Sequence, residues 1–185
     1  MKIMIITSSP NMDGLTAACG NAARQGIEEM GIEVVLFNLN KLDIGSCKAC
    51  GSGWGPCLNA HECQVEDDFQ MLHGAMWDSQ GFVFVTPVYW GDMSESAKAF
   101  LDRLRRCEAW KQGATFLQDK PFISVAAAGG SGNGLITTLL NMERLLIHVK
   151  AERFDYIGIT KKNRPYKLVA IREASKAMVE YIKSK

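Results

Sequence analysis

Four of the chain's six cysteines lie within seventeen positions, in the segment "SCKACGSGWGPCLNAHEC" at residues 46–63. Cys47 and Cys50 form a CxxC pair, and Cys57 and Cys63 follow after six and five intervening residues. Four thiolates suit an iron-sulfur cluster or a tetrahedral zinc ion, and the spacing alone does not separate the two. Free or regulatory thiols are a third interpretation. In a reducing compartment such a segment indicates metal or redox chemistry rather than a disulfide framework.

The other reactive side chains form no catalytic set. Neither a Ser-His-Asp nor a Cys-His-Asn arrangement stands in a motif, so a hydrolase would lack its residues. His61 lies in the cysteine segment and can serve as a metal ligand, but a solvated position is expected for each of the three histidines. The remaining groups have structural expectations: ion pairs for Lys98, Asp102 and Arg103, a helix cap for Asp67 and Asp68, and apolar packing for Cys19 and Cys107.

A polar loop, "TSSPNMDGLTAA" at residues 7–18, follows the first apolar run and leads into a helical pattern. Its hydroxyls, Gly14 and the free amides of the helix N-terminus together resemble a phosphate cradle. No Lys or Arg lies between Ile3 and Ala23, so neutral groups would hold the anion. The loop matches neither GxxxxGK[ST] nor GxGxxG, which argues against a triphosphate or dinucleotide fingerprint. A plain helix N-cap is the alternative.

Two more loops of unusual composition follow later apolar runs. In "TPVYWGDMSES" at 86–96, Tyr89 and Trp90 offer two π-surfaces for a flat ring, and Ser94 can cap the next helix. In "AAAGGSGNG" at 126–134, four glycines within six residues let a ligand approach the backbone. Aromatic packing in a core or subunit contact, and a flexible turn, are the respective alternatives. Together the three loops supply an anion cradle, an aromatic wall and a backbone edge, which are the parts of an FMN site.

Alternating strands and helices place these loops. Short runs rich in β-branched or aromatic residues predict strands at 2–8, 33–39, 81–87, 121–128 and 153–159, and helical patterns occupy about 15–30, 67–77, 94–107, 134–149 and 166–183. Near-continuous apolar strands suit a parallel sheet covered on both faces. The order predicts a three-layer, doubly wound α/β fold, whose ligands bind at the carboxyl ends of the strands. Residues 1–185 then form one domain, with a cysteine-rich loop at 45–66 after the second strand.

Composition limits the partners. The 185 residues are 47% hydrophobic, with 21 Lys and Arg against 20 Asp and Glu, which suits one sizeable core. Because no basic run and no long apolar stretch is present, we expect neither nucleic acid nor a membrane as a partner. The short apolar start does not make a signal peptide, so a soluble cytoplasmic protein is the expectation.

Two of these segments resemble a known family. "SSPNMDGLT" is similar to the GSPR-x-x-GNT phosphate loop, and "TPVYWGDMSESAKAFLDRL" is similar to the SPVY-(F/W)-G…KAFLDR segment, of NAD(P)H-dependent FMN reductases and iron-sulfur flavoproteins in the flavodoxin-like superfamily. The resemblance extends over almost the whole chain. Asn11 stands where Arg is usual, and Leu15 where Asn is common. The family implies five parallel strands in the order 2-1-3-4-5 and FMN at their carboxyl edge.

The resemblance also implies site residues. Residues expected around the phosphate are Ser8, Pro10, Gly14, Leu15 and Thr16; those along the ribityl chain and ring are Pro87, Val88, Tyr89, Trp90 and Gly91; those at the pyrimidine edge are Gly129 and Gly130. Iron-sulfur flavoproteins carry CxxCxxC-x(4 to 9)-C after strand two. Here Gly53 occupies the third cysteine position, so the 4Fe-4S ligands implied are Cys47, Cys50, Cys57 and Cys63.

The resulting function is a ping-pong oxidoreductase in which NAD(P)H reduces FMN, and a quinone, nitro compound, free flavin or carrier protein then takes the electrons. One alternative is an iron-sulfur flavoprotein that carries electrons from ferredoxin without using NAD(P)H. Another is a non-enzymatic redox- or metal-sensing module. The family implies a homodimer or homotetramer, to which Trp54, Trp77 and Trp110 can contribute apolar contacts or, alternatively, core packing.

Overall fold

In the computed structural model, the described residues are 1–109 and 115–185, so Trp110 lies outside them. Five parallel strands lie side by side in the order β2-β1-β3-β5-β6. Their bounds are β1 Lys2–Thr7, β2 Glu33–Asn38, β3 Gly81–Tyr89, β5 Pro121–Ala127 and β6 Glu152–Ile159. This order confirms the predicted 2-1-3-4-5 arrangement of the long strands. A two-residue strand, β4 (Asp92–Met93), pairs antiparallel with β3 and makes a sixth strand that the sequence analysis did not predict.

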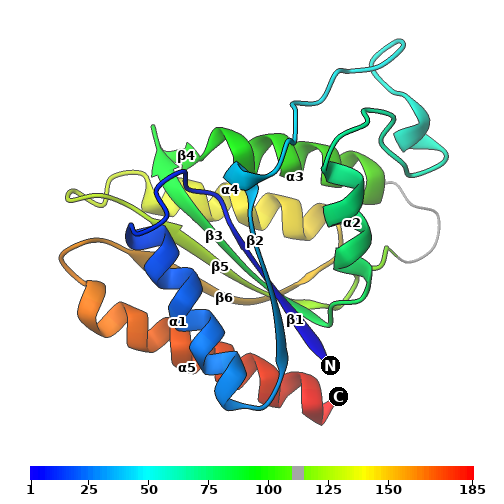
Figure 1. Cartoon of the computed structure of the whole chain (residues 1–185). Helices are drawn as coiled ribbons and strands as arrows, with labels where there is room; N and C mark the ends of the chain where they lie inside the picture. Colours follow the sequence, from blue (N-terminus) through cyan, green and yellow to red (C-terminus); the bar gives the residue numbers. More distant parts are fainter. Residues whose placement is uncertain (110–114) are drawn as a thin grey trace.

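Helices cover both faces of the sheet, which gives the predicted three layers (Figure 1). The first layer is α1 (Leu15–Glu29) with α5 (Arg164–Ser184), and the opposite layer is α2 (Phe69–Trp77), α3 (Glu95–Glu108) and α4 (Leu135–His148). Each face has its own apolar core. Ile5, Ile27 and Val179 belong to the core under α1 and α5, whereas Met4, Phe100 and Leu146 belong to the other.

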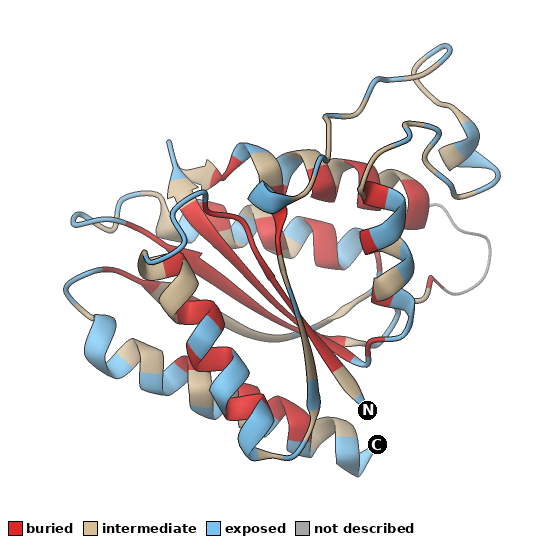
Figure 2. Cartoon of the chain, in the orientation of Figure 1, coloured by how far each residue is buried: buried red, intermediate tan, exposed pale blue. Residues whose placement is uncertain are grey.

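Local sequence explains where these elements begin and end. The strands β1, β3 and β5 are apolar and almost wholly buried, because helices cover both of their faces (Figure 2). The helix α1 is followed by Gly31, whose φ of 70° suits the left-handed turn that ends many helices. Ser94 caps α3, as predicted, by accepting a hydrogen bond from the Ala97 amide at 3.4 Å.

The carboxyl ends of the central strands meet at one edge of the sheet. Thr7, the last residue of β1, is opposite both Asn38 of β2 and Val85 of β3, and Pro87 is opposite Ala127 at the end of β5. The three loops singled out in the sequence therefore leave the sheet together.

The cysteine-rich loop projects beyond α2 and α3, away from the body of the sheet (Figure 1). It includes the short 3-10 turn η2 (Pro56–Leu58), and none of residues 45–66 is buried (Figure 2). A second short turn, η1 (Leu39–Lys41), leads into it from β2. Within the described ranges, no helix has both the length and the apolar content needed to cross a membrane.

Candidate functional site

The first loop presents the N-terminus of α1 at the carboxyl edge. Gly14 is the N-cap in an extended conformation, no side chain caps the helix, and its first turn holds no acidic residue. The helix dipole and the first-turn amides are thus available to an anion. Ser8 and Thr16 are buried, Gly14 and Leu15 are half-buried, and Pro10 is exposed. The Ser8 hydroxyl donates to the Val85 carbonyl at 3.4 Å.

The second loop is a tight hairpin, a shape that the sequence analysis did not predict. Val88 pairs with Met93 and Tyr89 pairs with Asp92, so Trp90 and Gly91 alone form the turn. Their φ values, 51° and 79°, are both positive, as a type I′ turn requires. Trp90 is fully exposed at the tip. An Asn-Gly pair would have signalled this turn, whereas a bulky residue at positive φ is uncommon.

The third loop packs against that hairpin. The Thr137 hydroxyl at the start of α4 donates to the Gly91 carbonyl at 2.7 Å. Gly134 has a φ of 81°, and a Cβ there would overlap the Cα of Gly91. Packing therefore requires this glycine, while Gly129 and Gly130 are exposed and face open space.

Hydrogen bonds join the first two loops as well. The Ser94 hydroxyl at the N-terminus of α3 donates to the Ser8 carbonyl at 2.8 Å, and the Ser94 amide donates to the Thr86 hydroxyl at 3.1 Å. Asn38, at the end of β2, donates to the Ser9 carbonyl at 3.1 Å. The three loops thus form one connected surface at the carboxyl edge, with backbone amides, exposed glycine backbone and two exposed aromatic rings.

A second site lies in the cysteine-rich loop. One pocket is lined by all four loop cysteines, Cys47, Cys50, Cys57 and Cys63, and also by Cys107 from α3. Cys107 is buried, as expected of an apolar filler, but it faces the same pocket. Burial, together with the nearby Cys63 and Cys57 sulfurs, raises the pKa of the Cys107 thiol to about 12. In the described part of the chain, no three His, Cys, Asp or Glu residues are grouped closely enough to hold a metal ion.

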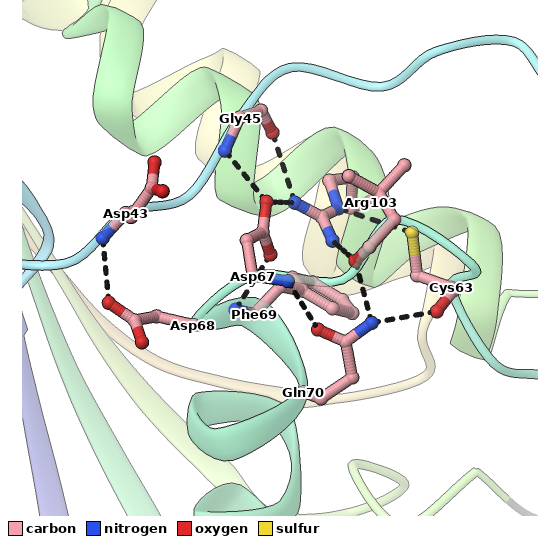
Figure 3. Close-up of polar contacts among 9 residues, drawn as sticks. Asp43, Gly45, Cys63, Asp67, Asp68, Phe69, Gln70 and Arg103 are labelled. Carbon is pink, nitrogen blue, oxygen red and sulfur yellow. Dashed lines mark hydrogen bonds and ion pairs between the residues drawn. The ribbon is translucent and has the colours of Figure 1, made fainter.

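Arg103 joins this loop to α3, a role that the sequence analysis missed (Figure 3). Only 1% of its side chain is exposed, and its guanidinium contacts the Asp67 carboxylate at 2.6 Å. The ion pair expected for Arg103 is present, and its partner is Asp67. Lys98 and Asp102 form the surface pair, at 2.5 Å. The available signal was the position of Arg103 beside Phe100, Leu104 and Cys107 on the buried side of α3.

The predicted cap of α2 has a different form. Asp68 stands at the N-cap but makes no capping hydrogen bond, and its carboxylate accepts from the Asp43 amide at 2.7 Å instead. Asp67 accepts from the amides of Phe69 and Gly45 at 3.0 Å each. Burial alone would raise the pKa of the Asp67 carboxyl, but the hydrogen bonds from Arg103, Gly45 and Phe69 outweigh burial and hold that pKa below its usual value.

The prediction of a solvated histidine is wrong for His73. Its Nε2 lies 2.9 Å from the buried Glu108 carboxylate, and its ring stacks on Phe69 with centroids 5.2 Å apart. His61 lies in the cysteine loop, with its Nδ1 atom 3.2 Å from the Cys107 carbonyl, and His148 is exposed on α4. Pairing of His73 and Glu108 depends on the packing of α2 against α3, which no sequence motif signals.

Comparisons with known proteins agree with this geometry. The model of the NADPH-dependent FMN reductase family matches residues 1–151. An iron-sulfur flavoprotein of Archaeoglobus fulgidus is 32% identical over 127 residues, which cover 69% of this chain and 62% of that protein. Another, from Methanocaldococcus jannaschii, is 28% identical over 149 residues, covering 80% and 73%. The match thus spans less than two thirds of the Archaeoglobus protein.

A solved structure shares the fold. The NAD(P)H:quinone oxidoreductase from Methanothermobacter marburgensis superposes with a TM-score of 0.72 over 96% of both chains, at 15% sequence identity. At that identity the likeness concerns the flavodoxin-like architecture alone.

Proposed function

We propose, because the chain belongs to the NADPH-dependent FMN reductase family, that it is an FMN-dependent oxidoreductase that passes electrons from NAD(P)H to a small acceptor or a carrier protein. The observation that carries this proposal is the connected surface of three loops at the carboxyl edge of the sheet. Parallel α/β sheets bind ligands at this edge. The absence of a Ser-His-Asp set from the sequence motifs is consistent with chemistry carried out by a cofactor rather than by side chains.

The chain's residues fit FMN group by group. The first loop would hold the phosphate at the α1 N-terminus, through Ser8, Pro10, Gly14, Leu15 and Thr16. The hairpin would line the ribityl chain and ring, through Pro87, Val88, Tyr89, Trp90 and Gly91. The open glycines, Gly129 and Gly130, would let the pyrimidine edge approach the backbone.

The cofactor, when bound, would accept a hydride from NAD(P)H and deliver electrons to the acceptor. The protein's own share is binding and orientation. The α1 amides and dipole would fix the phosphate without a nearby cation, since residues 4–22 contain no Lys or Arg. The exposed rings of Tyr89 and Trp90 would give the flavin, and the partner that stacks on it, an apolar surface.

We further propose that Cys47, Cys50, Cys57 and Cys63 hold an iron-sulfur cluster. Two observations support this assignment: both of the relatives described above are named iron-sulfur flavoproteins, and the four thiols line one pocket. The chemistry of the donors also fits, because thiolates are the usual ligands of iron-sulfur clusters. A cluster is larger than a single ion, so its ligands need not gather as closely as zinc requires. When bound, it would supply one-electron transfer.

A second candidate is an iron-sulfur flavoprotein that would carry electrons from ferredoxin and would not use NAD(P)H; the four thiols that line one pocket favour it. Anaerobic addition of NADPH and of NADH separates the candidates. Bleaching of the flavin absorbance supports the reductase, and a flavin that stays oxidised with both donors contradicts it. A protein that binds no flavin after reconstitution would instead support the non-enzymatic sensing module. Association into a homodimer or homotetramer remains a prediction, which light scattering tests.

The primary experiment is an ultraviolet-visible spectrum of protein purified without oxygen, combined with iron and acid-labile sulfide analysis. Flavin bands with a broad thiolate-cluster shoulder and about four irons per chain are the expected result. Serine variants of the four loop cysteines should each lower the iron content. The matched control is Cys19→Ser, in the opposite helix layer, which should leave the iron content unchanged. Flavin bands without iron or sulfide would support the FMN assignment and contradict the cluster.

A further inference from the structure

Arg103 contacts both ends of the cysteine-rich loop (Figure 3). One guanidinium nitrogen, Nη1, donates to the Gly45 carbonyl at 3.1 Å, just before the first cysteine. The other, Nη2, donates to the Val65 carbonyl at 2.9 Å, just after the last. A single side chain from α3 therefore closes the base of the loop.

The third contact of the same guanidinium is with sulfur. Its Nε–H donates to the Sγ atom of Cys63 at 3.3 Å. The positive charge is balanced by Asp67, and the Phe69 ring lies below the guanidinium with its centroid 4.3 Å away. The ion pair with Asp67, the two carbonyl contacts and the Phe69 ring together fix the orientation of the planar guanidinium. Its Nε–H therefore remains directed at Cys63.

Arg106, one turn further along α3, provides a comparison within the same pocket. It donates to the Gly53 carbonyl at 2.7 Å and its guanidinium lies 4.3 Å from the centroid of the Trp54 ring. These contacts are with the tip of the loop, and among the described residues Arg106 donates to no sulfur. Two arginines thus support the same loop, but only Arg103 distinguishes one cysteine from the other three.

We propose that Arg103 is a positioning residue that holds Cys63 and the base of the loop against α3 and donates a hydrogen bond to the Cys63 sulfur in the metal-bound protein. The hydrogen bond to a metal-bound Cys63 rests on the proposed cluster, whereas the positioning role does not. An N–H group that donates a hydrogen bond to a ligand sulfur stabilises the reduced centre more than the oxidised one, because the reduced centre carries more negative charge. Arg103 would therefore raise the reduction potential of the centre.

Hydrogen–deuterium exchange of the metal-free protein tests the positioning role. The variant is Arg103→Met combined with Asp67→Asn, so that no half-buried carboxylate is left unpaired, and Asp67→Asn alone is its reference. We expect exchange at least tenfold faster at residues 63–68 in the double variant than in the reference. Arg106→Met should accelerate exchange only around residues 51–54. Equal effects of both arginine variants along the whole loop, or no effect of Arg103→Met, would overturn the proposal.

Redox titration of the iron-loaded protein tests the sulfur contact. Arg103→Lys keeps a charge for Asp67 but lacks the planar fork, so it should lose the bond to Cys63. We expect the ratio of reduced to oxidised centre at a fixed potential to fall about tenfold, a shift of 59 mV for one electron. Arg106→Lys, the control, should leave the potential unchanged. An unchanged potential in Arg103→Lys would contradict the sulfur contact.

The two experiments separate the two proposals. If the wild-type protein binds no iron or sulfide, the cluster assignment fails, and with it the donor role toward a ligand sulfur. Exchange of the metal-free protein then decides the positioning role alone. If iron is bound and both arginine variants behave alike, the cluster stands and the inference about Arg103 fails.

Discussion

At the scale of single residues, Trp90 combines an unfavourable backbone with a fully exposed ring. Its φ of 51° lies in the left-handed region, which costs a bulky residue about 1–3 kcal/mol. Nothing in the core depends on its side chain. A large apolar residue kept in a strained turn, in one of the three loops proposed to bind FMN, fits a role in ligand stacking rather than in folding.

Replacement of Trp90 should therefore separate stability from binding. Asn is favoured at this position of a type I′ turn, so Trp90→Asn should raise the free energy of unfolding of the FMN-free protein by about 1 kcal/mol. FMN affinity should fall about tenfold, because a stacking surface is lost. Urea unfolding and fluorescence titration measure the two effects. The control is Ile147→Asn, which also replaces an exposed apolar residue but lies at the C-terminal end of α4, away from the three loops. This variant should not weaken FMN binding. A Trp90 variant that is less stable but binds FMN normally would refute this interpretation.

The Asp67 carboxylate predicts a dependence of stability on pH. Its folded pKa is lowered below the ordinary 3.8, so the ionised form stabilises the folded protein. That contribution is complete above pH 3.8 and is lost as the pH falls toward the lowered pKa. The metal-free wild type should thus lose its stability advantage over Asp67→Asn as the medium is acidified from pH 6 to pH 3. Urea unfolding across this range measures it, and a constant difference would contradict the assignment.

At the scale of elements, two helical glycines have opposite surroundings. Gly26 of α1 faces α5 so closely that a Cβ would overlap the carbonyl oxygen of Arg172, whereas Gly74 of α2 is exposed with no atom within 4 Å of that position. The close contact of α1 and α5 therefore depends on a missing side chain. On α2 the glycine serves no packing purpose.

Alanine at these two positions should have effects of opposite sign. Gly26→Ala should lower the free energy of unfolding by about 1–3 kcal/mol through overpacking. Gly74→Ala should raise it by about 0.5–1 kcal/mol, since Ala is the better helix former. Urea unfolding of both variants under one set of conditions checks the pair. Destabilisation by Gly74→Ala, or a neutral Gly26→Ala, would show that the layer packing differs from that described.

At the scale of the whole molecule, the sheet separates two buried apolar cores, and the three loops proposed to bind FMN lie at its carboxyl edge. The N-termini of α1, α3 and α4 all begin in loops at this edge. A ligand that contacts all three loops would therefore connect elements from both helix layers. Its binding would raise the free energy of unfolding of the whole structure.

FMN should accordingly stabilise the protein by mass action. At a free concentration of 100 times Kd, it should raise the free energy of unfolding by about 2.7 kcal/mol. Riboflavin at the same concentration should stabilise less, since it lacks the phosphate that the α1 N-terminus would hold. Unfolding in urea with each ligand measures the difference. Equal stabilisation by the two would contradict a phosphate site in the first loop.

The sequence by itself determined the architecture and the location of the edge. The apolar run of β1, predicted at 2–8, occupies Lys2–Thr7, and the helix predicted at 15–30 occupies Leu15–Glu29. Such elements can be predicted because their sequence signals are local: the periodicity of apolar residues, Ser94 as a helix N-cap and Gly31 as a helix terminator. Once five βα units are recognised, the strands are expected to be parallel, and parallel strands place the loops after β1, β3 and β5 at one edge of the sheet. The proximity of the four loop cysteines could also be predicted from the sequence, because they are close together in the chain.

Only the tertiary structure decided which distant side chains meet. Arg103 is 58 residues from Gly45 and 40 from Cys63, yet it contacts both. His73 and Glu108 are 35 residues apart, and Gly134 matters because Gly91 lies against it. None of these pairs has a local signature, since each depends on how one layer packs on another. The physical reason is that the free energy which places them comes from burial of whole helix faces, whereas periodicity and capping record only what each segment does alone.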